Sequence, residues 1–217
     1  MKKIIIWGGK GNGTVVLNTI IDINNLSATK QYEVIGFVNN KHKETVSIEG
    51  IPVLGDIDII NELVDKHDAY FLNAISSVNT MNIVKNTIDK ILINESNRLI
   101  NIIHPSAIIG NNVKLGNGCF IGHQSYIGQN AIIEDNCFIH AQCYVARDSI
   151  IKKHTYLAPK AYVGAEAIIE NSVYIGVGAL IKERVHINEF SIIGMGSIIV
   201  EDIPEKSKYY GEKAKKR

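Results

Sequence analysis

A six-residue repeat runs through the C-terminal half of the chain and limits its fold more than any other feature. Every sixth residue from Ile109 to Ile199 is Ile, Leu or Val, and the register holds over all sixteen positions. The residue two places earlier is small or Val, and Gly often follows the large aliphatic, as at Gly110, Gly122 and Gly176. A period of six fits neither an α-helix nor an array of hairpins, and it indicates a hexapeptide β-helix.

Each hexad supplies one short strand and one turn. The large aliphatic side chain is predicted to point inward and the small residue to lie where the wall is crowded. Gly or Asn is predicted at a turn position with an unusual backbone conformation. A single hexad cannot bury its own aliphatic side chain, so the coils must stack into a continuous core. Three hexads per coil predict a triangular prism, with His140 stacked between Gly122 and Ala158.

Composition argues against several functional classes. The 217 residues carry a formal net charge of +1, which gives no sign of a nucleic-acid-binding surface. No stretch reads as a signal peptide or as a membrane span, so we expect a cytoplasmic protein that does not bind membranes. Cys119, Cys137 and Cys143 all fall in the small-residue column. We expect them to be buried core side chains rather than disulfide partners or metal ligands.

The N-terminal region begins with a glycine-rich turn between an apolar run and a helical pattern. A short, mainly apolar strand is predicted over residues 3–7, Gly8 to Gly13 form the turn, and residues 14–23 have a helical pattern. This is the first unit of a Rossmann-like layout, in which backbone N–H groups favour a phosphate or a close ligand backbone. The spacing is not G-x-G-x-x-G, and no acidic residue ends the next strand. The loop is therefore either a ligand site or only a tight turn.

The rest of this region continues to alternate strands with helices. Strands are predicted over 34–38 and 69–75, a turn with a short strand over 50–55, and helices over 56–67 and 79–93. A last strand over 99–103 is expected to return to the same sheet, before His104 and Pro105 interrupt the pattern. We therefore predict a Rossmann-like α/β domain over 1–100. An all-β parallel β-helix with a short C-terminal tail follows over 101–217.

The hexad array resembles the left-handed β-helix of hexapeptide acyltransferases. A small α/β domain ahead of such a helix is similar to the nucleotide-sugar N-acetyltransferases of the bacillosamine pathway and to the sialic acid O-acetyltransferase-like proteins. The resemblance covers nearly the whole chain, and its marks lie at residues 8–13, 36–40, 51–55, 103–107, 175–178 and 194–204. It implies acetyl transfer from acetyl-CoA to the amino group of a nucleotide-linked amino-dideoxy sugar, for cell-surface glycan synthesis.

The resemblance also implies where the ligands bind. The nucleotide sugar is expected to contact Gly9, Lys10, Gly11, Asn12, Gly13, Asn39, Asn40, Ser76 and His104. Acetyl-CoA is expected in the groove between two prisms of a homotrimer, against Ala165, Val177, Gly178 and Met195. The family usually has an acidic pair at Asn39 and Asn40 and a His at Asn12. Amides still hydrogen-bond a base or ribose, so the nucleotide, whether UDP, dTDP or GDP, is left open. No metal is expected.

Catalysis needs a neutral amine or a general base, and a donor that faces the developing oxyanion. The family's base is a His followed by an acidic residue, whereas this chain has Arg147 and Asp148, and Arg cannot be deprotonated. A second His of the family matches Tyr156. His140 either is tolerated at an exposed corner or handles the proton, as Asp148 also could. Asp148 could instead orient the amine or pair with Arg147, which could bind a phosphate. In a third route, the amine binds neutral and the CoA thiolate collects the proton.

Three alternative functions share the same scaffold. Acetyl transfer to a hydroxyl, as in sialic acid O-acetylation, depends more on a strong base, so the missing His favours the amine. A γ-type carbonic anhydrase needs three His on facing walls. Here His123, His140 and His154 occupy different slots of the hexad, and such enzymes lack the N-terminal domain. A nucleotide-sugar binder without catalytic activity stays open because of Arg147.

Overall fold

The computed structural model describes residues 1–40, 46–75, 84–90 and 98–211. The chain divides into two compact units. The first unit holds Met1–Pro105 and Asn117–Phe120, and the second holds Ser106–Gly116 and Ile121–Arg217.

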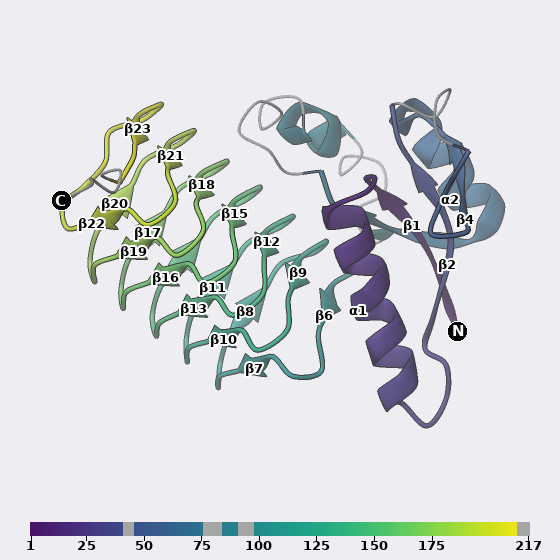
Figure 1. Ribbon diagram of the computed structural model, residues 1–217, viewed down its shortest axis with the longest axis horizontal. Helices are drawn as coiled ribbons and strands as arrows, with labels where there is room; N and C mark the ends of the chain where they lie inside the picture. The colour runs from purple at the N-terminus through teal and green to yellow at the C-terminus, as the bar shows by residue number, and fades with distance from the viewer. Residues whose placement is uncertain (41–45, 76–83, 91–97, 212–217) are drawn as a thin grey trace, which may run out of the picture. The chain divides into compact units, whose positions relative to one another are not determined.

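A five-stranded sheet with the order β3-β4-β2-β1-β5 forms the middle of the N-terminal unit (Figure 1). Its pairs are parallel except for the β3–β4 hairpin. The strands are β1 (Lys2–Trp7), β2 (Tyr32–Val38), β3 (Ser47–Ile48), β4 (Ile51–Gly55) and β5 (Ala69–Asn73). Helix α1 (Asn12–Leu26) connects β1 to β2, whereas the 3₁₀ turn η1 (Ile57–Ile59) and helix α2 (Ile60–His67) connect β4 to β5. Residues 84–90 are also helical.

The predicted alternation of strands and helices is confirmed, and the helices follow their apolar periodicity. In α1, Val16, Ile20 and Ile23 are buried at the three- and four-residue spacing of one helix face. The first turn is held by Thr14, whose hydroxyl donates to the carbonyl oxygen of Gly11 at 2.7 Å. In α2, Ile60, Leu63 and Val64 are buried at the same three- and four-residue spacing. The result is the Rossmann-like α/β layer expected from the sequence.

Two predicted strands change in the structure, and one predicted helix is described only in part. Strand β5 ends at Asn73, because its side-chain oxygen accepts a hydrogen bond from the N–H of Ile75 at 2.8 Å and turns the chain. The predicted strand over 99–103 is wrong: Leu99 makes a single bridge to Phe71, and β6 (Ile102–Ile103) joins a sheet of the prism. Residues 102–103 lie six positions before the first hexad strand, so they follow the hexad register. Of the predicted helix over 79–93, residues 84–90 are helical and the others lie outside the described residues.

The hexads form a stack of two-residue strands, each of which ends on the predicted aliphatic position (Figure 1). The strands are β7 (Ile108–Ile109), β8 (Lys114–Leu115), β9 (Phe120–Ile121), β10 (Tyr126–Ile127), β11 (Ile132–Ile133), β12 (Phe138–Ile139), β13 (Tyr144–Val145), β14 (Ile150–Ile151), β15 (Tyr156–Leu157), β16 (Tyr162–Val163), β17 (Ile168–Ile169), β18 (Tyr174–Ile175), β19 (Leu180–Ile181), β20 (His186–Ile187), β21 (Ile192–Ile193) and β22 (Ile198–Ile199). A final strand, β23 (Lys208–Tyr209), follows.

Three parallel sheets form the walls of this prism. Their strand orders are β22-β19-β16-β13-β10-β7, β20-β17-β14-β11-β8 and β23-β21-β18-β15-β12-β9-β6. Successive hexad strands of one sheet lie eighteen residues apart, as Tyr126 paired with Tyr144 shows. Three hexads per coil, and the place of His140 between Gly122 and Ala158, are therefore confirmed: the N–H of Gly122 donates to Ile139, and that of His140 to Leu157.

The core of the prism is the predicted stack of aliphatic side chains. Ile127, Val145 and Val163, for example, have no exposed surface. All three cysteines are buried, as predicted from their place in the small-residue column. Burial raises the pKa of the Cys143 thiol to about 12, so this thiol stays protonated and behaves as a small core side chain.

The turn chemistry differs from the prediction in one respect. Positive φ angles fall on the third residue after each aliphatic, such as Asn130 and Gly178, not on the glycine that directly follows it. That glycine answers a different need, because a Cβ on Gly122 would lie 2.7 Å from the backbone nitrogen of Ala141 in the next coil. The glycines in the first turn position therefore serve the close approach of neighbouring coils.

Candidate functional site

One corner of the prism has a nearly bare backbone in its C-terminal coils, at residues 176–179 and 194–197. This glycine corner consists of residues 122–125, 140–143, 158–161, 176–179 and 194–197, the turns that follow β9, β12, β15, β18 and β21. Gly178 and Gly196 both have positive φ, and a Cβ on either would have no atom within 4 Å. Val177 and Met195 stand out from this edge, 44% and 74% exposed. The structure thus brings together Val177, Gly178 and Met195 of the predicted acetyl-CoA residues.

His140 lies on the same corner, directly after β12. Its Nδ1 accepts a hydrogen bond from the N–H of Ala141 at 2.8 Å. Its ring lies near that of Phe138, with centroids 6.0 Å apart, and edge-on to that of Tyr156 at 6.5 Å. Burial, and secondarily the nearby His123, lower the pKa of His140 below its usual value of 6.5. His140 is therefore neutral at pH 7.

Arg147 and Asp148 lie on the next corner along the chain, within a network of charges. This ion-pair corner consists of residues 128–131, 146–149, 164–167 and 182–185. Arg147 contacts Asp148 at 2.6 Å and Glu166 at 3.3 Å, and Arg184 contacts Glu166 at 2.9 Å. The side-chain amide of Asn130 donates to Asp148 at 2.9 Å. Of the alternatives for Asp148, pairing with Arg147 is the one that the structure contains.

This network fixes the charge state of its members. Hydrogen bonds from Asn130 and Arg147 lower the pKa of Asp148, and a hydrogen bond from Arg184 lowers that of Glu166. The same contact with Asp148 raises the pKa of Arg147. Both arginines are exposed and both carboxylates are partly exposed, so their ion pairs contribute little to stability. Asp148 is ionised at neutral pH but is only a weak base.

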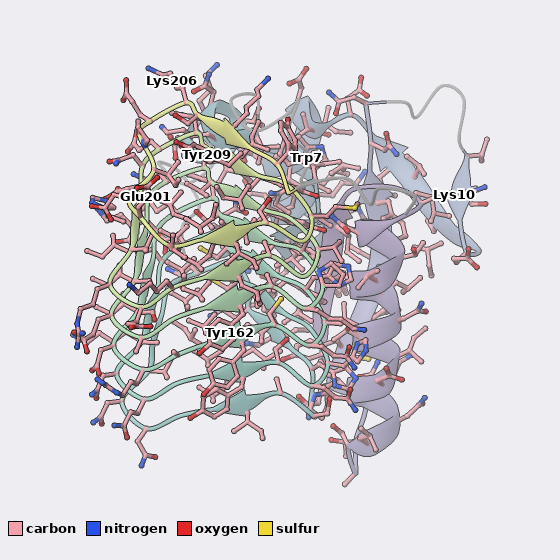
Figure 2. All side chains as sticks on the ribbon, turned by 60° about the vertical axis from the view of Figure 1, so that its left-hand side comes forward. Trp7, Lys10, Tyr162, Glu201, Lys206 and Tyr209 are labelled. Atoms are coloured by element: carbon pink, nitrogen blue, oxygen red, sulfur yellow. The ribbon has the colours of Figure 1, made fainter. Side chains whose placement is uncertain are left out.

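An exposed row of tyrosines covers the prism wall between these two corners. This tyrosine face is the outward side of the sheet that contains β7, β10, β13, β16, β19 and β22, and its residues are Ile108, Tyr126, Tyr144, Tyr162, Leu180 and Ile198. The Tyr126 and Tyr144 rings stack at 4.9 Å, and those of Tyr144 and Tyr162 at 5.1 Å. Figure 2 shows Tyr162 on this wall. This row was not predicted from the sequence, although three tyrosines spaced eighteen residues apart are a signal of it.

A hollow of about 520 Å³ opens where the tyrosine face meets the ion-pair corner. Its lining includes the three tyrosines together with Arg147, Ala165 and Glu183. The structure therefore brings the predicted residues Arg147 and Ala165 together here. Ala165 lies on a different corner from Val177, Gly178 and Met195, and His140 lies on a different corner from Arg147 and Asp148. Within one prism, the predicted residues form two groups.

In the N-terminal unit, the glycine loop and the end of β2 lie side by side. A Cβ on Gly9 would lie 2.8 Å from the side-chain nitrogen of Asn39, and Gly8 donates its N–H to Val38. A Cβ on Gly13 would lie 3.2 Å from the Phe37 ring, so glycine lets α1 approach the sheet closely. The rest of this predicted group follows in the loop or directly after Asn39: Lys10, Gly11, Asn12 and Asn40.

The two other predicted sugar contacts stand apart from that loop. The Nε2 of His104 lies 3.3 Å from a carboxylate oxygen of Asp22, in the second half of α1. Ten helical residues separate Asp22 from Asn12, a rise of about 15 Å. The structure therefore does not bring His104 to the glycine loop. Ser76 lies outside the described residues.

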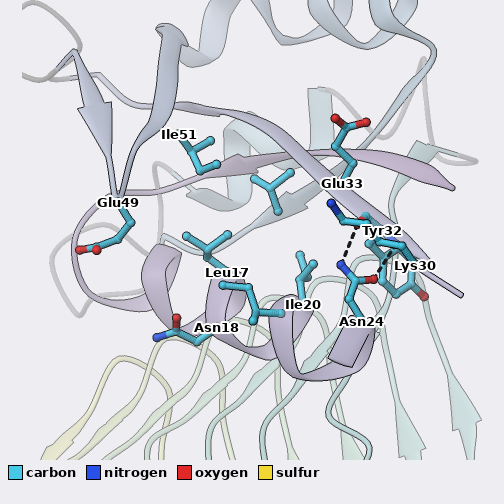
Figure 3. A pocket seen from close by; sticks show the side chains of 11 residues that line it. Leu17, Asn18, Ile20, Asn24, Lys30, Tyr32, Glu33, Glu49 and Ile51 are labelled. Carbon is cyan, nitrogen blue, oxygen red and sulfur yellow. Dashed lines mark hydrogen bonds between the residues drawn. The ribbon is translucent and has the colours of Figure 1, made fainter. Parts of the chain in front are cut away.

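A second hollow, of about 500 Å³, lies between α1, β2 and the β3–β4 hairpin (Figure 3). Its lining includes Leu17, Asn24 and Glu33, and none of the predicted substrate residues. Asn24 is already engaged, since its amide donates to the carbonyl of Tyr32 and accepts from the N–H of the same residue. This hollow is therefore not the predicted nucleotide site.

The histidines considered for zinc binding do not form a cluster within one prism. His123 and His140 lie on the glycine corner, whereas His154 lies on the third corner, where its Nδ1 is 2.9 Å from the amide of Asn136. Among the residues that the structure describes, no three His, Cys, Asp or Glu side chains converge as a metal site. None of the helices in the described ranges is long and apolar enough to cross a membrane.

Comparison with family models divides the chain in two. Residues 3–88 match the model of the PglD N-terminal domain, and residues 89–194 match that of the GMPPB C-terminal domain. A search of curated protein sequences found no match.

Solved structures with the same two-part architecture cover nearly the whole chain. A mutant of GDP-perosamine N-acetyltransferase from Caulobacter crescentus, in complex with CoA and GDP-perosamine, is 23% identical with a TM-score of 0.82, over 97% of this chain and 94% of that one. The acetyltransferase domain of PglB from Neisseria gonorrhoeae FA1090 is 19% identical with a TM-score of 0.82, over 97% of both chains. WeeI from Acinetobacter baumannii AYE is 22% identical with a TM-score of 0.79, again over 97% of both. These likenesses show the predicted fold, an N-terminal α/β domain followed by a left-handed β-helix.

Proposed function

Because the chain joins a PglD-type N-terminal domain to a hexapeptide-repeat left-handed β-helix, we propose that it is an acetyl-CoA-dependent N-acetyltransferase. Its acceptor is the amino group of a nucleotide-linked amino-dideoxy sugar, used in cell-surface glycan synthesis. The pairing of these two domains in one chain is the observation that carries the proposal. The Caulobacter relative was solved with CoA and GDP-perosamine, and the Neisseria domain was also solved with acetyl coenzyme A.

The nucleotide of the acceptor binds at the glycine loop of the N-terminal domain. The contact between Gly9 and Asn39 supports this, because it puts loop backbone and a side-chain amide at one edge of the sheet. Backbone N–H groups there, at the N-terminus of α1, favour a phosphate. Asn39 and Asn40 supply amides that both donate and accept, and these bind the base or ribose.

Acetyl-CoA lies along the glycine corner. Gly178 and Gly196 support this placement of acetyl-CoA, because the space that a Cβ on either residue would fill is open. An extended ligand arm can therefore approach the backbone, with Val177 and Met195 as exposed apolar contacts on either side. Ala165 contacts the same ligand from the ion-pair corner of a neighbouring prism.

A homotrimer makes that second contact possible. The tyrosine face is apolar and exposed. A shallow hollow on this face, distinct from the two described above, is lined by Tyr162, Leu180 and Ile198 and is almost entirely apolar. Burying such a patch between prisms removes apolar surface from water. This wall separates the two corners within one chain, so packing it against a neighbour brings the glycine corner of one prism to the ion-pair corner of the next.

The chemistry favours an amine over a hydroxyl as acceptor. Arg147 cannot be a base, and Asp148 is a weak one because its pKa is lowered by Asn130 and Arg147. An amine that binds in its neutral form can attack a thioester without a strong base. A hydroxyl has a far higher pKa and depends more on one. Asp148 keeps Arg147 in place, and Arg147 faces a phosphate of the acceptor.

A thiol-release assay tests the proposal. The protein is mixed with acetyl-CoA and a panel of UDP-, dTDP- and GDP-linked amino sugars, and free CoA thiol is followed. We expect release with at least one amino sugar and none with its hydroxyl counterpart. Release with a sialic acid alone would point to O-acetylation. Binding of a nucleotide sugar without any release would indicate a binder that lacks catalytic activity.

A further inference from the structure

The hydrogen bond inside the His140 turn determines which ring nitrogen carries the proton. A backbone N–H can only donate, and that of Ala141 points at Nδ1 from 2.8 Å. Nδ1 must therefore be the unprotonated nitrogen. In a neutral imidazole the other nitrogen then carries the hydrogen, so Nε2 is an N–H donor with no lone pair to accept a proton.

The Nε2–H group is free to serve a ligand. Within the described part of the chain, Nε2 has no hydrogen-bond partner, and the neighbouring Phe138 and Tyr156 offer ring contacts. Those rings and the turn hold the imidazole in one orientation. His140 is thus a fixed, neutral donor.

The Nε2–H donor of His140 lies on the glycine corner. His140, Ala158 and Gly176 occupy the same position in three successive coils. Neighbouring strands are about 4.8 Å apart, so Gly176 is about 10 Å from His140 along this edge. A ligand arm that lies against Gly178 and Gly196 can therefore deliver its end to His140.

We propose that His140 is a catalytic hydrogen-bond donor, which binds the acetyl carbonyl oxygen through Nε2–H, and not the general base. The proposal rests on the proposed acetyl transfer and assigns this residue its part in it. It replaces one of the alternatives left open by the sequence, in which His140 takes up the proton. Arg147 and Asp148 do not supply a strong base either, so the route is substrate-assisted.

The step balances without a protein base. The neutral amine attacks the thioester carbon, a C–N bond forms, and the carbonyl oxygen becomes an oxyanion that accepts the Nε2–H hydrogen bond of His140. Collapse of this intermediate breaks the C–S bond and releases CoA as a thiolate. The thiolate takes the proton from the new ammonium group, which leaves an N-acetyl amide and free CoA thiol.

Two substitutions of the same residue separate a donor from a base. His140→Gln keeps an N–H donor at the distance of Nε2 but cannot act as a base, whereas His140→Ala removes both. Loss of one oxyanion donor costs about 10²–10³-fold in kcat. We expect kcat of His140→Ala to fall by this amount and that of His140→Gln to stay within about 10-fold of the wild type, with an unchanged pH profile. Equal losses of kcat in both variants, or loss of the acidic limb of the pH profile in both, would overturn the donor role.

The tautomer itself can be measured without turnover. Nitrogen NMR of the wild-type protein, labelled at histidine and assigned by comparison with His140→Gln, distinguishes a protonated Nε2 from a protonated Nδ1 at pH 7.5. We expect the hydrogen on Nε2, and a hydrogen on Nδ1 would refute the proposal. This result stands apart from the proposed function, which fails if the wild-type protein transfers no acetyl group to any amino sugar.

Discussion

At the scale of single residues, the site is defined by groups that cannot act as strong bases. Arg147 is held by Asp148 and Glu166, and the hydrogen bonds that hold it also keep Asp148 ionised. His140 is neutral because burial opposes its charge. Such a site suits a nucleophile that arrives uncharged, and it suits poorly a reaction in which the enzyme must remove a proton from a hydroxyl.

The lowered pKa of His140 predicts a pH-dependent stability. In the unfolded chain this residue takes up a proton near pH 6.5, whereas in the folded protein burial and His123 oppose protonation. The unfolded state therefore binds more protons below pH 6.5, so this residue lowers the stability as the pH falls through that range. Replacing His140 by Gln removes the effect.

Thermal unfolding of the wild type and His140→Gln between pH 7.5 and 5.5 checks this. We expect the Tm of the wild type to fall more steeply than that of the variant as the pH decreases. Parallel curves would mean that His140 titrates alike in the folded and unfolded states.

At the scale of the element, one hexad combines three requirements in six residues. The aliphatic side chain fills the core, the next position must allow the backbone of the following coil to approach, and the third turn residue adopts positive φ. Asn, Gln, Lys and Glu occupy that third position elsewhere in the prism. Glycine is therefore not required there for folding, and Gly178 is available for a ligand.

Gly178→Asn should separate binding from stability. Asn tolerates positive φ, and no atom lies within 4 Å of the new Cβ, so the stability should change by less than about 1 kcal/mol. The added side chain occupies the bare edge, so the KM for acetyl-CoA should rise about 10-fold or more, the cost of about 1.4 kcal/mol of lost binding. Steady-state kinetics and thermal unfolding measure the two effects.

His154→Asn is the matched control for this substitution. It occupies the same positive-φ position on the third corner, where we propose no ligand. An unchanged KM for acetyl-CoA is expected in this variant. If Gly178→Asn also left the KM unchanged, acetyl-CoA would not lie along the glycine corner.

Most of the hexad structure could be predicted from the residue types and their six-residue spacing. The inward aliphatics, the small column with its three cysteines and the eighteen-residue coil all follow from a period that admits one packing. The role of the glycine after each aliphatic was misassigned, because a close backbone approach and a positive φ select the same residue. The strand over 99–103 was misplaced because residues 102–103 suit a sheet strand and a hexad equally well.

At the scale of the whole molecule, the proposed function depends on a proposed association of prisms. The tyrosine face leaves Tyr144, Leu180 and Ile198 partly exposed, which is unusual for a wall of a monomer. The predicted residues fall on two corners separated by this wall, so within one chain the two groups of residues do not meet. The assignment of the site therefore stays a prediction, because its completion requires contacts between copies that a sequence does not encode as spacing.

Tyr144→Glu should disrupt the proposed trimer. A carboxylate in the middle of the stacked tyrosines would be buried without a partner, which is costly at an interface. We expect a monomer by sedimentation, with circular dichroism like that of the wild type and acetyl transfer reduced at least about 100-fold, the scale of lost positioning.

Lys114→Glu changes the charge at the same outward strand position on another wall, and it serves as the control. It should leave both assembly and activity unchanged. A trimer that survives Tyr144→Glu would exclude the tyrosine face as the interface.

The identity of the acetylated atom tests the central claim most directly. Acetyl-CoA labelled with ¹³C in the acetyl group is incubated with the protein and a nucleotide-linked amino sugar, and the product is examined by mass spectrometry and NMR. We predict a single added acetyl group, joined to the sugar nitrogen as an amide. An ester on a sugar oxygen, or an unmodified sugar recovered under conditions in which it binds, would contradict the account.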